Sequence, residues 1–478
     1  MEEIRLDIAI IGTGTSGMGA YREAKKFTDS IALIEGDQYG TTCARVGCMP
    51  SKLLIAPAEA RYRANYFERF GLVGAVPAVD GAAVMKRVRD ERDRFVGFVV
   101  KAVEGFDEAH RIRAHATFVD DHRLQLSDGR MLRAERIIVT VGSRPFIGDQ
   151  LAPLGDRVIT SDELFYLHEL PSSIAVFGAG IIGLELGQAL HRLGVRMRLF
   201  GRGGSIGPLT DPAIIAYAAE TFAQEYPILP DAQVEGVMRE GDQVRVDFMA
   251  GGGRVTEYFD MVLAATGRRS NVDGLGLEHT SLQLDERGIP LYNPDTMQCG
   301  DSHIFIAGDA DGDLALLHEA SDEGRLAGEN GGRYPEVYRR ARKTPLSIVF
   351  SDPQIGLAGK TYRELTESGI EFATGTVDFE DQGRSRVMLV NKGLLHIYGD
   401  PHTGEVLGAE MIGPHHEHLA HLIAWSIQAR MNAQDIVQMP FYHPVIEEGL
   451  RSGLRTLLAA MNMAPAPPLR CIDCGPGG

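Results

Sequence analysis

Apolar runs that end in glycine-rich turns form a repeated strand–helix–strand pattern along the chain. Residues 8–11 are apolar, the turn 12–17 holds three glycines, and a helical stretch reaches about residue 27 before a second apolar run ends in an acid. In such a unit the first glycine allows a tight turn, the second lets a pyrophosphate approach, and the third lets helix pack on strand. The helix amino end favours phosphate, and the acid can accept from a ribose hydroxyl. The pattern predicts a dinucleotide site containing Gly12, Gly14, Gly17 and Glu35.

The same pattern recurs later in the chain. Apolar residues 174–177 lead into the turn 178–183, a helix extends to about residue 193, and a strand covers 197–200. This strand ends in Gly201 and Arg202 rather than in an acid. Two such units predict two dinucleotide sites, the second of which contains Gly178, Gly180 and Gly183.

Other stretches follow different periodicities. Asp80 can cap a long helix at 80–106, and residues 124–132 alternate about an Asp-Gly turn, which predicts a hairpin. Residues 137–142 and 304–309 are typical of buried strands. From about residue 345 the pattern indicates a separate α+β domain, with strands at 347–350, 393–398 and 406–410 and helices at 417–429 and 447–460.

Composition narrows the functional class. The chain has 478 residues, which predicts about three domains, and a formal net charge of −17, which disfavours nucleic-acid binding. It has no run of 18 apolar residues, so we expect no membrane span. A first strand close to Met1 leaves no room for a signal peptide, so we expect a cytoplasmic protein. Five cysteines are too few for a disulfide scaffold of this length.

A closely spaced cysteine pair follows the first dinucleotide unit. Cys43 and Cys48 lie five positions apart, which in a regular helix separates Cα atoms by about 8–9 Å. A disulfide needs about 7 Å or less, so a bridge requires an irregular turn, which Gly47 allows. The alternatives are two structural thiols or a zinc site. No second Cys or His pair lies nearby at ligand spacing, so we expect no metal.

The ordered motifs resemble those of the class I pyridine nucleotide-disulfide oxidoreductases, a family of flavoproteins, and most closely its dihydrolipoamide dehydrogenase branch. The resemblance covers roughly residues 4–460. It rests on both glycine turns, the Cys-x4-Cys segment, and the segments 142–145, 265–269, 307–309 and 317–320, and finally on His443-Pro444 with Glu448.

The resemblance implies an α/β fold with two Rossmann-like domains and a C-terminal α+β dimerisation domain. It implies that residues 1–150 and 271–344 bind FAD and that residues 151–270 bind NAD or NADP. It also implies that residues 345–462 form the dimerisation domain and that residues 463–478 are a flexible tail containing cysteines. It further assigns Lys52, Gly142 and Asp309 to the FAD site, and Glu185, Arg202 and Gly267 to the nicotinamide-nucleotide site.

The resemblance also assigns the catalytic roles. Cys43 meets the substrate, and Cys48 is the thiolate that faces the flavin. Lys52 and Glu185 would form an ion pair beside the cofactors, although on sequence alone two independent surface charges are equally compatible. His443 would be the base, oriented by Glu448, and would reach the dithiol of the partner in a homodimer.

Two features differ from the dihydrolipoamide dehydrogenase pattern. NAD-linked relatives usually have an acid where Gly201 stands, whereas arginine at the next position is typical of NADP-linked reductases, so we expect NADP to be accepted. The alternative is a solvated Arg202 with NAD use. Cys471 and Cys474 are similar to the C-terminal thiols of thioredoxin and mercuric reductases; the alternative is a disordered end with incidental cysteines.

These features predict a dihydrolipoyl dehydrogenase. It would oxidise a small dithiol or lipoyl protein through a Cys43–Cys48 disulfide and pass hydride from FAD to NAD(P)+. A second hypothesis is an NADPH-dependent reductase of glutathione, thioredoxin or mercuric type, with the C-terminal cysteines taking part. A third is a non-catalytic redox-sensing flavoprotein, which the intact dithiol, His443 and Glu448 disfavour.

Overall fold

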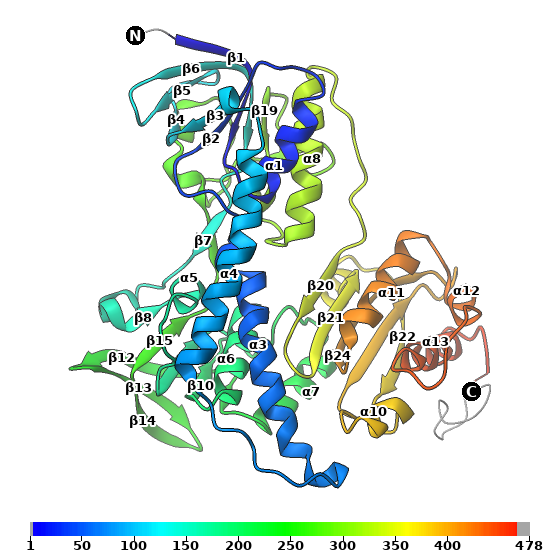
Figure 1. Cartoon of the computed structure of the whole chain (residues 1–478). Helices are drawn as coiled ribbons and strands as arrows, with labels where there is room; N and C mark the ends of the chain where they lie inside the picture. The colour runs from blue at the N-terminus through cyan, green and yellow to red at the C-terminus, as the bar shows by residue number, and fades with distance from the viewer. Residues whose placement is uncertain (1–2, 466–478) are drawn as a thin grey trace.

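The computed structural model describes residues 3–465, and three large sheets organise them (Figure 1). Two of these sheets are built mainly from parallel strands with helices against them, and the third is antiparallel. The predicted fold class is therefore confirmed. In the described part of the chain, no helix combines the length and the hydropathy that crossing a bilayer requires.

The first sheet collects strands from both ends of the first 310 residues. Its central strands are buried on both faces, which explains their continuous apolar sequence. The late strand β19 pairs with β6, so the chain returns to this sheet after forming the second one. In order the sheet contains β17 (Tyr292–Asn293), β18 (Gln298–Cys299), β19 (Ile304–Ile306), β6 (Met131–Val139), β1 (Glu3–Ile11), β2 (Ile31–Glu35) and β3 (Arg111–Arg113), with β4 (Ala116–Phe118) and β5 (Arg123–Leu126) at the side.

Helices α1 (Thr15–Ala24) and α8 (Leu317–Arg333) lie side by side against this sheet (Figure 1). Their backbones approach closely, because a Cβ at Gly324 would lie 2.2 Å from the Ser16 carbonyl oxygen. The contact fixes the amino end of α1, where the first glycine turn lies, against a segment three hundred residues later in sequence.

The second sheet is parallel throughout and carries the second glycine turn. Its strands are β11 (Ile228–Leu229), β10 (Arg196–Phe200), β9 (Ser173–Phe177), β15 (Met261–Ala264) and β8 (Val158–Ile159). Three helices belong to this region: α5 (Ser161–Leu164), α6 (Ile181–Arg192) and α7 (Pro212–Ala223). One small antiparallel sheet contains β12 (Val234–Glu240), β13 (Gln243–Ala250) and β14 (Gly253–Phe259). A second consists of β7 (Ser143–Pro145) and β16 (Arg268–Ser270).

The third sheet forms the C-terminal part of the described chain. It contains β20 (Leu346–Val349), β21 (Gln354–Gly359), β24 (Val406–Gly413), β23 (Leu394–Gly399) and β22 (Ala373–Asp378), in that order. Its helices are α9 (Tyr362–Glu367), α10 (Gly383–Val387), α11 (His416–Gln428), α12 (Ala433–Val437) and α13 (Glu448–Ala460). The predicted strands and helices of this region are confirmed, and α11 and α13 begin within one residue of their expected positions.

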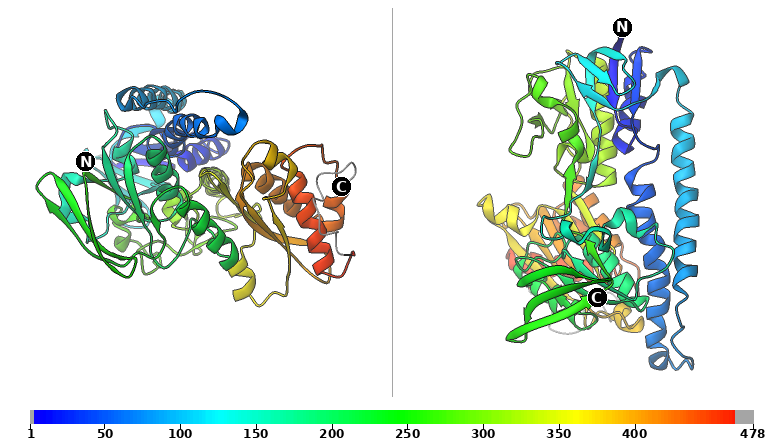
Figure 2. Two further views of the ribbon diagram at one scale, coloured as in Figure 1. Left: turned by 90° about the horizontal axis from the view of Figure 1, so that it is seen from below. Right: turned by 90° about the vertical axis from the view of Figure 1, so that its left-hand side faces the viewer.

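A helical hairpin connects the first two sheets. After the short α2 (Thr42–Arg45), α3 (Cys48–Arg63) and α4 (Gly81–Glu104) run side by side along the molecule (Figure 2). Asp80 caps α4 by accepting a hydrogen bond from the Ala83 amide at 2.9 Å, as predicted. Because α3 also packs against α6, the segment after the dithiol reaches the second sheet.

The predicted hairpin at 124–132 is confirmed, because β5 pairs with β6 in antiparallel register. Its return arm and the strand predicted at 137–142 are one strand, β6, which pairs with β1 from Met131 to Val139. Helix α3 begins at Cys48, and Pro50 fits in its first turn because a proline there lacks only an amide that would have no helical partner. The β12–β14 sheet was not predicted. Cys471 and Cys474 lie outside the described residues.

Candidate active site

Cys43 and Cys48 lie on consecutive helices separated by one irregular turn. The Thr41 side chain caps α2, and α3 begins at Cys48. Between them Gly47 has a φ of −125° and a ψ of −118°, and a Cβ there would lie 3.0 Å from the Thr42 carbonyl oxygen. The irregular turn predicted at Gly47 is therefore present. It brings the two sulfurs into hydrogen-bonding contact.

The two thiols of this pair differ in acidity. The hydrogen bond with Cys48, together with burial, raises the pKa of the Cys43 thiol. The same hydrogen bond lowers the pKa of Cys48 to about 7, and the charge of Lys52 acts in the same direction while desolvation opposes both. Cys48 also opens α3, and a helix amino end stabilises a thiolate. In the reduced pair Cys48 is therefore the more acidic thiol, and once it is ionised Cys43 donates a hydrogen bond to it.

Lys52 and Glu185 form an ion pair that joins α3 to α6. Lys52 Nζ lies 2.7 Å from Glu185 Oε2, and it also lies 4.3 Å from the centroid of the Phe350 ring. The other carboxylate oxygen accepts a hydrogen bond from the Phe350 amide at 2.9 Å. Glu185 is only 5% exposed, which rules out two independent surface charges. The pair holds a positive charge one helical turn from Cys48.

The first glycine turn leaves open space at the amino end of α1. Gly12 has a φ of +107°, and a Cβ on Gly17 would lie 2.0 Å from the Gly12 carbonyl oxygen. Gly14, in contrast, would place its Cβ more than 4 Å from any heavy atom. Glu35 Oε2 accepts hydrogen bonds from the Thr13 amide at 3.0 Å and hydroxyl at 2.8 Å. The turn is thus tightly packed on one side, open on the other, and bonded to the acid at the end of β2.

The second glycine turn repeats this geometry at α6. Gly178 has a φ of +114°, and a Cβ on Gly183 would lie 1.8 Å from the Gly178 carbonyl oxygen. Gly180 has no heavy atom within 4 Å of a Cβ position. Both turns therefore present free space where a helix amino end can receive phosphate.

Gly142 and Gly267 occupy equivalent positions, three residues after the last residues of β6 and β15. Each has a positive φ and no heavy atom within 4 Å of a Cβ position, and each leads into a strand of the β7–β16 pair. Ser143 follows the first of them and donates a hydrogen bond to Asp309 Oδ2 at 2.7 Å. Arg268 follows the second and donates to Ser143 Oγ at 2.8 Å. This chain of contacts fixes the Asp309 carboxylate.

The end of β10 has no room for an acidic side chain. A Cβ at Gly201 would lie 2.5 Å from the Pro230 carbonyl oxygen. Arg202 is exposed and forms no ion pair with any described residue. The amide of the next residue, Gly203, donates to Asp231 Oδ1 at 2.8 Å. The loop therefore offers a cation to solvent at this strand end.

His443 and Glu448 form the predicted acid–base pair. His443 Nδ1 lies 2.9 Å from Glu448 Oε1, and Glu448 Oε2 accepts from the Val445 amide at 3.1 Å. Glu448 is 8% exposed at the start of α13, while His443 is exposed. With its Nδ1–H donating to the carboxylate, the ring leaves Nε2 free to accept a proton.

A single chain contains three pairs of candidate site residues: the dithiol, Lys52 with Glu185, and His443 with Glu448. Among the described residues of this single chain, no hydrogen bond or ion pair joins the histidine pair to the dithiol, and α13 lies well away from α3 in Figure 1. Phe350 and Arg342 also contribute to the site and were not predicted from the sequence. Arg342 bonds Glu323, whose Oε2 accepts from the Gly308 amide at 2.8 Å and so holds the turn before Asp309. No sequence spacing signals either contact.

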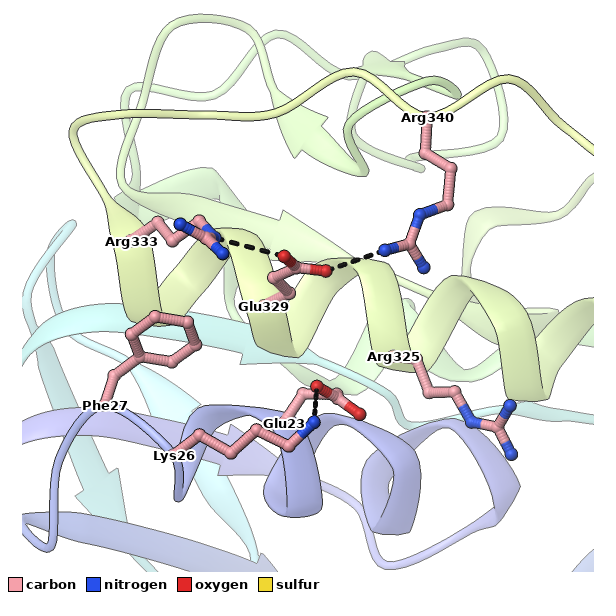
Figure 3. A pocket seen from close by; sticks show the side chains of 7 residues that line it. All are labelled: Glu23, Lys26, Phe27, Arg325, Glu329, Arg333 and Arg340. Atoms are coloured by element: carbon pink, nitrogen blue, oxygen red, sulfur yellow. Dashed lines mark hydrogen bonds and ion pairs between the residues drawn. The ribbon is translucent and has the colours of Figure 1, made fainter.

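A cavity of about 330 Å³ lies elsewhere, between the carboxyl ends of α1 and α8 (Figure 3). Glu329 there accepts hydrogen bonds from Arg333 at 3.1 Å and Arg340 at 2.9 Å, and Lys26 pairs with Glu23. None of the predicted site residues lines it. Both of its acids, Glu23 and Glu329, are paired with basic side chains.

Comparison with known proteins gives a consistent family. The pyridine nucleotide-disulphide oxidoreductase family matches residues 6–324, and its dimerisation domain matches residues 346–453. A protein named dihydrolipoyl dehydrogenase from Chlamydia pneumoniae is 28% identical over 470 residues, which are 97% of this chain and 98% of that protein.

Two solved structures show the same fold. The HOCl-induced flavoprotein disulfide reductase RclA from Escherichia coli superimposes with a TM-score of 0.78 at 22% identity, covering 95% of this chain and 99% of that one. LpdA from Mycobacterium tuberculosis superimposes with a TM-score of 0.79 at 22% identity and the same coverage.

Proposed function

The chain belongs to the pyridine nucleotide-disulphide oxidoreductase family, and we propose that it is a dihydrolipoyl dehydrogenase that oxidises a dihydrolipoyl group through Cys43 and Cys48, with FAD as cofactor and NAD(P)+ as acceptor. Family membership makes it an enzyme acting on sulfur groups, and its dimerisation domain supports a homodimer. The observation that carries the proposal is the contact of Cys43 with Cys48 across the turn at Gly47, at the amino end of α3 and one helical turn from the Lys52–Glu185 ion pair.

The residues present fit FAD at the first glycine turn. Gly14 leaves the space that a pyrophosphate needs, and Glu35 stands beside the turn, where it can accept from the adenosine ribose. Asp309, fixed by Ser143, is suited to the flavin end. The open space at Gly180 fits a nicotinamide nucleotide in the same way. Bound FAD would supply the two-electron transfer between the dithiol and the nicotinamide.

The dithiol can exchange with a dihydrolipoyl group in two balanced steps. One substrate thiolate attacks Cys43 of the oxidised pair, so that a mixed disulfide forms and Cys48 leaves as thiolate. The second substrate thiolate then attacks its own mixed-disulfide sulfur, which releases Cys43 and closes the lipoyl disulfide. The charge of Lys52 and the amino end of α3 stabilise the Cys48 thiolate as it leaves, whereas burial of Cys43 favours its reprotonation after the second step.

His443 is the base in this proposal. Each substrate thiol must lose a proton before it attacks, and Nε2 of a ring held by Glu448 can take it. Because His443 and the dithiol do not meet within one chain, a second copy would supply the histidine. The Lys52–Glu185 pair holds a fixed positive charge near Cys48 throughout the cycle.

A turnover assay tests the assignment. Purified full-length enzyme is supplied with dihydrolipoamide and either NAD+ or NADP+, and separately with NADPH and oxidised glutathione or thioredoxin. We expect kcat/KM for dihydrolipoamide to exceed that for either disulfide by at least about tenfold. A preference for glutathione or thioredoxin would replace the proposal with the alternative, an NADPH-dependent reductase. The end of β10 favours this alternative, because Gly201 leaves no room for an acidic side chain there.

The nicotinamide preference is a separate prediction. Since Gly201 excludes an acid and Arg202 is unpaired among the described residues, we expect NADP to be accepted. A charge-assisted hydrogen bond to the 2′-phosphate is worth about 1.5–3 kcal/mol, so Arg202→Ala should lower kcat/KM for NADP+ by about 10–100-fold and leave NAD+ within about twofold. Arg239→Ala, an exposed arginine of the same region, is the matched control. Equal losses with both nucleotides would contradict the role of Arg202.

The acidity of Cys48 is a further prediction. Cys43→Ala removes the hydrogen bond that does most to lower the pKa of Cys48, so this pKa should rise from about 7 by about one unit or more, and the thiolate should appear at higher pH. The pH dependence of iodoacetamide alkylation at Cys48, followed by mass spectrometry in FAD-loaded enzyme, measures it. Cys43→Ser retains a hydroxyl donor and should shift less. An unchanged midpoint in Cys43→Ala would mean that the hydrogen bond does not control the thiolate.

A further inference from the structure

Three metal-ligating side chains converge where β24 turns into α11. One ligand atom from each of His415, Glu417 and His418 lies within 4.8 Å of the other two. His415 precedes the helix, and the other two residues belong to its first turn. The rings of the two histidines stack with their centroids 5.9 Å apart. The proposed redox chemistry uses none of these residues.

The chemistry of the three groups matches a divalent transition metal. Two imidazole nitrogens and one carboxylate oxygen suit zinc, nickel or copper, with metal–ligand bonds of about 2.0–2.2 Å. Glu417 Oε1 and His418 Nε2 are 3.9 Å apart, which is too far for a hydrogen bond, so neither ligand atom is already engaged by the other. Because both histidines are exposed, water can complete the coordination sphere.

The backbone at this helix start does not offer an anion site instead. The Glu417 amide donates to Gln354 Oε1 at 3.0 Å, and the His418 amide donates to the His415 carbonyl oxygen at 3.0 Å. Two donors of the first turn are therefore satisfied. The side chains around them present lone pairs, which a cation can accept.

The surroundings of Glu417 contain further negative charge. Burial is the main cause that raises the pKa of Glu59 on α3. The negative charges of Asp352 and Glu417 also raise this pKa, whereas the positive charges of Arg192 and Arg63 lower it. The carboxylate of Glu59 on α3 is thus among the charges that face the Glu417 side of the ligand group.

We propose that His415, Glu417 and His418 bind a divalent transition-metal ion of the zinc, nickel and copper type. This departs from the sequence-based expectation of no metal, which considered only ligands near the dithiol. An ion here would tie the start of α11 to the end of β24, next to the contact with Gln354 on β21.

The site can be tested on the untagged, FAD-loaded full chain. Cys43, Cys48, Cys471 and Cys474 are replaced by serine to remove competing thiols, and Zn²⁺ is titrated in competition with a chromogenic chelator. We expect saturable binding that weakens by at least about tenfold in His418→Ala and in His415→Gly. Since His415 has a φ of +52°, glycine removes the ligand without straining the backbone.

His402→Ala supplies the matched control. His402 is exposed and lies 3.2 Å from the carboxylate of Glu371, but it belongs to no group of three ligands among the described residues. Binding should be unchanged in this variant, and Zn²⁺ should raise the melting temperature of the control but not that of His415→Gly or His418→Ala. With Cu²⁺, the electron paramagnetic resonance spectrum should show hyperfine coupling to nitrogen. This coupling should disappear when His415→Gly and His418→Ala are combined. Equal Zn²⁺ affinity in the control and in His415→Gly/His418→Ala would overturn the proposal.

Discussion

Replacing Cys48 by serine is expected to reduce dihydrolipoamide-dependent reduction of NAD(P)+ by on the order of 10⁴-fold or more. Serine cannot form a disulfide with Cys43, so the substrate thiolate has no disulfide to attack and no mixed disulfide can form. The effect is on kcat, because the exchange step itself disappears. Steady-state turnover with saturating dihydrolipoamide measures it.

Two controls separate this loss from damage to the fold. The variant should still oxidise NADPH or NADH with ferricyanide as acceptor, since that reaction needs the proposed cofactor site but not the dithiol. Cys299 is buried at 1% exposure, outside the predicted site, and Cys299→Ala should retain dihydrolipoamide turnover. If Cys48→Ser kept more than about a hundredth of the original turnover, the disulfide would not be the route of the electrons.

The same experiment distinguishes the two sulfurs. In Cys43→Ser, the remaining Cys48 is expected to ionise near neutral pH and to give a long-wavelength absorption with bound FAD if its thiolate faces the flavin. Cys48→Ser should lack this band, because burial still raises the pKa of Cys43 when the Cys48 thiolate is absent. A band in Cys48→Ser but not in Cys43→Ser would reverse the roles assigned to the two cysteines.

Local features of the site could be predicted from the sequence. The glycine turns need residues that tolerate a positive φ and the close approach of another backbone segment. Glycine at positions 12 and 178 therefore indicates these two properties. The irregular turn at Gly47 follows from the spacing of the two cysteines. The histidine pair spans five residues, and the family resemblance placed it correctly.

Contacts that depend on tertiary packing could not be predicted in this way. Phe350 meets Lys52 and Glu185 only because β20 lies next to α3 and α6, and no spacing rule links residues 165 positions apart. The steric reason for Gly201 lies in Pro230, on the loop after a different strand. The length of β6 likewise depends on β1, which pairs with it along its whole length.

His443→Gln is expected to lower kcat for dihydrolipoamide oxidation by about 10²–10⁴-fold, the usual contribution of a positioned general base. Glutamine can still hydrogen-bond to Glu448 but cannot take the proton of an incoming thiol. His279→Gln, which changes an exposed histidine near a carboxylate, should retain full activity. Turnover with ferricyanide should be unaffected in His443→Gln, because it involves no thiol proton.

Mixed dimers decide which chain the histidine serves. Chains carrying Cys48→Ser and chains carrying His443→Gln are each nearly inactive as homodimers. If His443 acts on the dithiol of the other copy, a heterodimer places both defects in one site and leaves the second site intact, so it should recover about half of the normal activity. If His443 acted within its own chain, both sites would carry a defect and the heterodimer would stay inactive. Since no hydrogen bond or ion pair joins the His443–Glu448 pair to the dithiol among the described residues of one chain, and α13 lies away from α3 (Figure 1), we expect recovery.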